Sequence, residues 1–240
     1  MSHSTIEYSP VGTPVLERTV GELVAERPSR SRIFQARGVD FCCQGGRTLL
    51  EACQRRDIDP EEMVTMLEKE EEEPAPEENP AELGPLELVD YIVKRHHGFL
   101  RGELPRLHEM AARVARVHGP HTPSLVTLLE VFEGMMFELA HHLMKEEDVL
   151  FPAIGAMVSG ETAGIPLDGA IATMMDEHED AGRALQELRE LTNGFRPPEG
   201  ACNTYRALFA GLLELEGDLH RHIHLENSVL FPAAKKLAGI

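Results

Sequence analysis

The sequence predicts an all-α protein, in which a four-helix up-down bundle follows a small helical N-terminal domain. Two observations carry this prediction. After residue 84, four long segments place apolar residues at alternating steps of three and four, the spacing of a helix with one buried face. Before them, a run of four glutamates and three prolines between residues 70 and 80 is typical of a solvated linker. A hydrophobic content of 42% is ordinary for a globular chain.

The first 84 residues are expected to form a tail at 1–14, a small domain at 15–70 and an acidic, proline-rich linker at 71–84. Within the small domain, short helices are expected at 19–24, 33–38, 48–52 and 59–67. The last begins at Asp59-Pro60, a capping residue followed by a first-turn proline. About 55 residues form only a marginal core, so this domain is expected to need the bundle, a metal or a second chain.

Residues 85–240 are expected to form the bundle. Its apolar stripes run through four segments: 86–114, 125–149, 171–188 and 205–229. Two of these helices begin with a first-turn proline, Pro85 and Pro123. Four long amphipathic helices joined by modest loops are typical of a four-helix bundle.

Residue types that bind metals fill gaps in these stripes. In the second and fourth helices the stripe runs from a histidine by a step of four to a glutamate, and by a step of three to a valine. These positions are His142, Glu146 and Val149, and His222, Glu226 and Val229. A buried carboxylate without a partner costs several kcal/mol, so two of them on core faces need compensation. Cations bound by converging imidazoles and carboxylates would supply it.

The third and first helices offer further imidazoles. A step of four from Met174 places His178 on the third stripe. The first helix contains His96 and His97, and the step of four from Val93 favours His97. His96 is then expected on the flank of the helix, where it faces the other domain or hydrogen-bonds a carboxylate.

The sequence also repeats itself. Residues 142–153 and 222–233 share the pattern H-x3-E-x2-V-L-F-P-A, so the two helical hairpins look like copies of one unit. A lone H-x3-E is a weak signal in a chain with 41 acidic residues, but its recurrence in phase with the stripes is a strong one. Each hairpin contributes two histidines and one glutamate, the inventory of a dinuclear carboxylate-bridged site. Ligand types alone leave iron, manganese and zinc open.

These residues, with VDFCCQGGRTL at 39–49 and the stretches at 95–105 and 176–182, resemble a known family. The bundle resembles the hemerythrin-like domains. Nearly all of residues 15–235 is similar to the iron–sulfur cluster repair di-iron proteins, the RIC family of ScdA and YtfE type. The resemblance implies two iron ions per chain, bridged by two glutamates and an oxo or hydroxo group. Their ligands would be His97, His142, Glu146, His178, His222 and Glu226.

The resemblance also implies roles outside the ligand set, although it assigns no catalytic residue apart from the metal site. Glu138 and Glu177 are expected to line access to the irons, the alternative being a solvated helix face. Cys42 and Cys43 are expected to interact with iron or with clusters, the alternative being two small buried residues. In the family two glycines follow the cysteine pair directly, whereas Gln44 intervenes here.

The function implied by the resemblance is repair of iron–sulfur clusters damaged by oxidative or nitrosative stress, by supplying iron. Damaged iron–sulfur proteins would be the partners. Two alternatives stay open, namely reduction of nitric oxide or O2 at the same di-iron centre and a gas-binding sensor, so whether the chain is an enzyme is undecided. Plain O2 storage is disfavoured, because O2-carrying hemerythrins have a second histidine one turn from the third-helix ligand. The neighbouring turns here offer Met174 and Gly182.

Charge and composition argue against several other classes. A net charge of −18 disfavours a nucleic-acid or anionic membrane surface. No run of 18 apolar residues predicts a membrane span, and no secretory signal is recognisable. The four cysteines, two of them adjacent, do not indicate a disulfide framework. A cytoplasmic location is therefore expected, and a homodimer is left open.

Overall fold

The structure, a computed structural model, describes residues 13–71 and 79–240. Residues 1–12 of the expected tail and residues 72–78 of the expected linker lie outside the described residues. The described part of the chain is built of helices and contains no β-strand, so the predicted all-α class is confirmed. None of the helices described is long and apolar enough to cross a membrane.

The chain packs as two compact units. The first contains the described residues up to Tyr91, together with Ala153–Ala172 and His220–Ile240. The second consists of Ile92–Pro152 and Thr173–Leu219. This division follows packing within the fold, and the domain bounds expected from the sequence stay a prediction.

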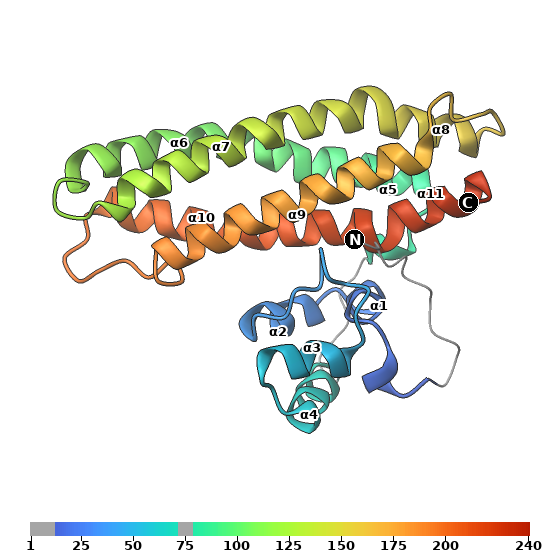
Figure 1. The fold of residues 1–240 in the computed structure, drawn as a ribbon, viewed down its shortest axis with the longest axis horizontal. Helices are drawn as coiled ribbons and strands as arrows, with labels where there is room; N and C mark the ends of the chain where they lie inside the picture. Colours follow the sequence, from blue (N-terminus) through green and yellow to red (C-terminus); the bar gives the residue numbers. More distant parts are fainter. Residues whose placement is uncertain (1–12, 72–78) are drawn as a thin grey trace. The chain divides into compact units, whose positions relative to one another are not determined.

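The second unit is a four-helix bundle, formed by α6 and α7 and by most of α9 and α10 (Figure 1). Its helices are α6 (Gly98–His118), α7 (Ser124–Lys145), α9 (Leu167–Leu191) and α10 (Asn203–Leu225). The predicted stripes supply its core, with Leu100, Leu107, Leu128, Phe132, Leu188, Leu208 and Leu215 almost completely buried. The four-helix prediction is therefore confirmed, because the apolar face of each helix is the one that the spacing identified.

Three wide turns interrupt the long helices. They are the π-helical segments η3 (Val93–His97), η4 (Glu146–Leu150) and η5 (Glu226–Leu230). Each joins two α-helical stretches: α5 (Pro85–Ile92) precedes η3, α8 (Phe151–Val158) follows η4, and α11 (Phe231–Ala238) follows η5. A π turn holds one more residue than an α turn and is frequent at functional sites.

The wide turns shift the buried face by one residue. The expected stripe position Val149 is 47% exposed, whereas Leu150 is buried, so placing Val149 in the core is wrong. In the second copy of the repeat, Val229 is only half-buried and Leu230 is fully buried. A regular spacing of 3.6 residues per turn misplaces the buried face here, because the helix widens at each of the two glutamates.

The first unit contains the short helices of the N-terminal segment. These are η1 (Val15–Glu17), α1 (Val20–Glu26), α2 (Arg30–Ala36), α3 (Leu49–Arg56) and α4 (Pro60–Glu71), followed by η2 (Pro80–Glu82). Thr19 and Thr48 begin α1 and α3 with capping boxes that also use Glu22 and Glu51. The core includes Val20, Leu23, Phe34, Leu49, Cys53 and Met63. Within the same unit, α1 packs against η5.

Candidate metal centre

The six predicted ligands lie at or beside the wide turns, and all are buried. His97 ends η3, Glu146 begins η4 and Glu226 begins η5. His142 and His222 stand one turn before the two glutamates, on α7 and α10, and His178 lies on α9. None of the six is more than 3% exposed. A π turn therefore presents one ligand on three of the four long helices.

These side chains gather into two overlapping sets of ligand atoms, in each of which all atoms lie within 4.8 Å of one another. One set is His97, Glu146, His222 and Glu226, and the other is His142, Glu146, His178 and Glu226. Both glutamates belong to both sets, while each histidine belongs to one. That sharing is what two neighbouring ions bridged by carboxylates require. The role of the six residues as ligands stays a prediction.

Individual distances fit metal coordination. The two oxygens of Glu146 divide between two histidines: Oε2 lies 3.3 Å from His97 Nε2, and Oε1 lies 3.3 Å from His142 Nε2. His178 Nε2 lies 3.1 Å from His142 Nε2. Two nitrogens that bind one ion about 2.1 Å away at nearly right angles are about 3 Å apart. In the other copy of the repeat, His222 Nε2 lies 3.1 Å from Glu226 Oε1.

The buried carboxylate of Glu146 provides a test of whether a cation fits. Its side chain is completely buried, and neither oxygen accepts a hydrogen bond from the described residues. Burying a carboxylate without donors costs several kcal/mol, and a cation repays that cost. Imidazole and carboxylate ligands without a thiolate suit iron, manganese or zinc.

Two outer carboxylates orient the imidazoles. His97 Nδ1 donates to Glu147 at 2.6 Å, and His142 Nδ1 donates to Glu177 at 2.8 Å. Each acid also pairs with a cation, Arg101 for Glu147 and Lys145 for Glu177. With Nδ1 protonated, Nε2 of each imidazole carries the lone pair that a metal needs.

The pKa values of the outer acids reflect these contacts. The hydrogen bond from His142, helped by Lys145, lowers the pKa of Glu177 to about 2 against the effect of burial. Burial alone would raise the pKa of Glu147, but hydrogen bonds from Arg101 and His97 hold it below its ordinary value. Both side chains are therefore anionic at neutral pH, which strengthens the imidazoles as ligands.

Further acidic and imidazole side chains lie outside the predicted ligand set. His96 is buried and its Nδ1 contacts Asp218 Oδ2 at 3.0 Å, the carboxylate contact that was one of its two expected placements. Asp218 and Glu147 were missed, although Glu147 directly follows a predicted ligand. Glu138 lies exposed on α7, and its place on an access path stays a prediction.

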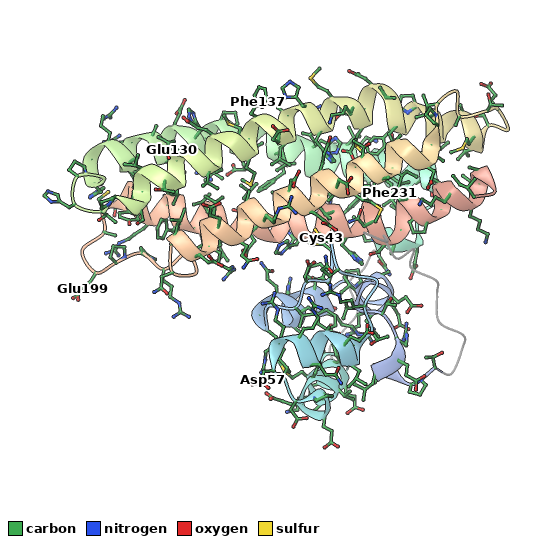
Figure 2. The ribbon with its side chains drawn as sticks, in the orientation of Figure 1. Cys43, Asp57, Glu130, Phe137, Glu199 and Phe231 are labelled. Atoms are coloured by element: carbon green, nitrogen blue, oxygen red, sulfur yellow. The ribbon has the colours of Figure 1, made fainter. Side chains whose placement is uncertain are left out.

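The cysteine pair lies in the loop at 39–48 between α2 and α3, hereafter the cysteine loop; Cys43 is labelled in Figure 2. Asp40 Oδ1 accepts the backbone N–H groups of Cys42, Cys43 and Gln44 at 3.0, 2.9 and 3.3 Å. A Cβ on Gly45 would lie 2.6 Å from the Phe41 carbonyl oxygen, so this tight turn requires glycine. Both cysteines are free thiols.

The two thiols lie side by side, Sγ to Sγ at 3.8 Å. Cys42 is buried, and Cys43 is half-buried. The hydrogen bond with Cys43, burial and the charge of Asp40 together raise the pKa of the Cys42 thiol well above its ordinary value. Without a cation beside it, Cys42 is therefore a protonated thiol.

The other two cysteines lie apart from the pair. Cys53 is buried in the core of the first unit. Cys202 is exposed, and its sulfur lies 3.4 Å from His118 Nε2.

Two family models match this chain, one over the helical bundle and one over the N-terminal segment with the cysteine loop. The hemerythrin HHE cation binding domain matches residues 88–234, and ScdA_N, a domain of unknown function (DUF542), matches residues 16–71. Proteins named iron-sulfur cluster repair protein YtfE from Pectobacterium atrosepticum and Pectobacterium carotovorum are each 40% identical, and one from Musicola paradisiaca is 38% identical. Each alignment covers 91% of this chain and 96% of the relative. The chain belongs to the YtfE family of iron–sulfur cluster repair proteins.

Proposed function

We propose that this protein repairs damaged iron–sulfur clusters by holding two iron ions in its helical bundle and giving up iron to the cluster. The observation that carries the proposal is the pair of ligand sets that share Glu146 and Glu226. The names of the relatives support the repair function, and the hemerythrin HHE match supports iron as the metal. Iron is the cargo in this proposal, so its release is the step to explain.

Each iron ion would be bound by two histidines of its own and by the two shared glutamates. His97 and His222 would hold one ion, His142 and His178 the other, and both glutamates would bridge them, with the oxo or hydroxo bridge of the family completing the set. A di-iron centre of this kind supplies iron in a form that nitrogen and oxygen ligands hold without thiolates. Glu147 and Glu177 keep the Nε2 atoms of His97 and His142 aimed inward, which preserves this part of the site while iron leaves and returns.

The neighbourhood of His178 favours release over tight gas binding. One turn before it stands Met174, a buried thioether, and one turn after it stands Gly182. Neither is an imidazole, so an ion held by His142 and His178 would have one protein ligand fewer and could bind exchangeable ligands instead. Sites with open positions exchange ligands more readily than closed ones.

The cysteine loop would contact the damaged cluster to which iron is transferred. Thiolates are the ligands of iron–sulfur clusters, and Cys42 and Cys43 offer two of them from one turn. Iron–sulfur proteins are accordingly the proposed partners, and the cytoplasm is the proposed location. A homodimer stays a prediction.

Iron content and iron transfer test the proposal together. Protein purified anaerobically from iron-replete cells should hold about two irons per chain. It should restore activity to an iron–sulfur enzyme whose cluster has been damaged by nitric oxide, with loss of iron from the bundle. The Cys42→Ser, Cys43→Ser double variant should retain iron and lose repair, and Cys202→Ser should retain both. Catalytic conversion of nitric oxide to N2O with full retention of iron would overturn the donor role.

A further inference from the structure

A second cluster of metal-binding side chains lies in the cysteine loop. The ligand atoms of Asp40, Cys42 and Cys43 all lie within 4.8 Å of one another. The two sulfurs are 3.8 Å apart, and Cys42 Sγ is 3.3 Å from Asp40 Oδ1. None of the three belongs to the ligand sets of the bundle. We propose that Asp40, Cys42 and Cys43 form a separate site for one divalent ion of the softness of Fe²⁺ or Zn²⁺, bound through two thiolates and a carboxylate.

The distances match tetrahedral coordination. With metal–sulfur bonds of about 2.3 Å, two thiolates on one tetrahedral ion are about 3.8 Å apart. With a metal–oxygen bond of about 2.0 Å, a carboxylate oxygen is about 3.5 Å from each of those sulfurs. The Sγ–Sγ spacing of 3.8 Å and the spacing of 3.3 Å between Cys42 Sγ and Asp40 Oδ1 are close to these values, and the Asp40 ligand atom lies within 4.8 Å of Cys43 Sγ.

The loop is held in place before any ion binds. Three backbone N–H groups converge on Asp40 from inside the loop. From α10 and η5, His224 Nδ1 contacts the Phe41 carbonyl oxygen at 3.3 Å, and Asn227 Nδ2 donates to the Cys42 carbonyl oxygen at 3.2 Å. The ring of Phe41 packs edge-on against His224, 5.8 Å between centroids. Such support reduces the entropy that ion binding must overcome.

Binding of the ion requires no electron transfer. The ion forms two metal–sulfur bonds and one metal–oxygen bond, and the two thiols release their protons to water. Three protein ligands leave the fourth tetrahedral position for water or for a ligand from a partner. A role for this site in passing iron to a cluster rests on the proposed function. Binding of an ion by Asp40, Cys42 and Cys43 does not depend on that function.

Cobalt(II) is the probe, because thiolate ligation produces intense near-ultraviolet charge-transfer bands that nitrogen and oxygen ligands do not. Full-length protein, purified anaerobically with its bundle loaded with iron, is titrated with Co²⁺. We expect the bands to saturate at about one ion per chain. Cys43→Ser should abolish them, and Cys202→Ser should leave them unchanged. Asp40→Asn keeps an oxygen for the three N–H groups and removes the charge, so it should weaken binding by about tenfold or more.

The outcomes separate this site from the proposed function. Absence of thiolate bands in the unaltered protein, or bands that persist in Cys43→Ser while the circular dichroism spectrum is unchanged, overturns the site. Bands that saturate as expected in a protein without repair activity support the site and count against the function. Repair without any thiolate band supports the function and rejects the site.

Discussion

The Glu177→Gln substitution tests whether the carboxylate behind His142 controls iron binding. Glu177 accepts from His142 Nδ1 at 2.8 Å and pairs with Lys145, and its pKa lies at about 2 instead of 4.5. That depression corresponds to about 3 kcal/mol. Because 25% of the side chain is exposed, solvent screening leaves about 1–2 kcal/mol of it. Glutamine keeps an oxygen for Nδ1–H but loses the charge, so we expect the affinity for one iron to fall about tenfold.

The assay measures how much iron each protein retains as a competing chelator is added under anaerobic conditions. Glu179→Gln is the matched control, because Glu179 lies on the same helix and pairs with exposed Arg183 at 3.9 Å. In Glu177→Gln one of the two irons should be extracted at about one tenth of the chelator concentration that the control needs. Identical extraction curves for Glu177→Gln and Glu179→Gln would refute the orienting role of this carboxylate.

Three further predictions concern the bundle ligands and the cysteine loop. Glu226→Ala should remove both irons, because Glu226 belongs to both ligand sets, whereas His178→Ala should weaken only one; iron per chain distinguishes them. Burial lowers the pKa of His224 to about 4 against the opposing backbone hydrogen bond, so the unfolded chain binds more protons between pH 6.5 and 4. The free energy of unfolding of iron-free protein should therefore be fully maintained above pH 6.5. It should fall by up to about 3 kcal/mol as the pH drops to 4, and His224→Gln should lose that part of the pH dependence. Asn227→Ala removes the hydrogen bond to the cysteine loop, so alkylation of the cysteine pair should be faster than in the unaltered protein; equal rates would exclude a holding role.

The residues of the bundle centre could be found from the sequence because burial and chemistry conflict at them. Histidine and glutamate rarely occupy apolar stripes, and His142 and Glu146 recur as His222 and Glu226 eighty residues later. The preference for His97 over His96 rests on a different signal, the step of four from Val93. What spacing alone could not supply was the arrangement of Glu146, whose two oxygens face different histidines.

The register after each glutamate was not predictable from helical spacing. Buried residues follow at steps of four on α7, η4 and α8, through His142, Glu146, Leu150 and Ile154. A regular α-helix would drift away from the core over three such steps, and the π turn absorbs that drift by widening the helix. The exposed Val149 marks the residue that the widening displaces.

Glu147 and Asp218 escaped prediction because nothing in their spacing distinguishes them from acids on a solvated helix face. Glu147 is adjacent to Glu146, yet its partners are His97 and Arg101, 50 and 46 residues away. Asp218 reaches His96 across 122 residues. Contacts between helices of this kind depend on how the helices are rotated, and the sequence of one helix does not contain that information.

The two copies of the repeat diverge at the residue that follows Glu146 in one copy and Glu226 in the other. In η4 that residue is Glu147, whose carboxylate orients His97. In η5 it is Asn227, whose amide instead holds the Cys42 carbonyl of the cysteine loop. An amide cannot supply the negative charge that strengthens an imidazole, but it can donate to a carbonyl, which a carboxylate cannot. One copy of the duplicated turn thus orients His97, a predicted ligand, while the other carries Glu226 and, through Asn227, holds the backbone of the cysteine loop.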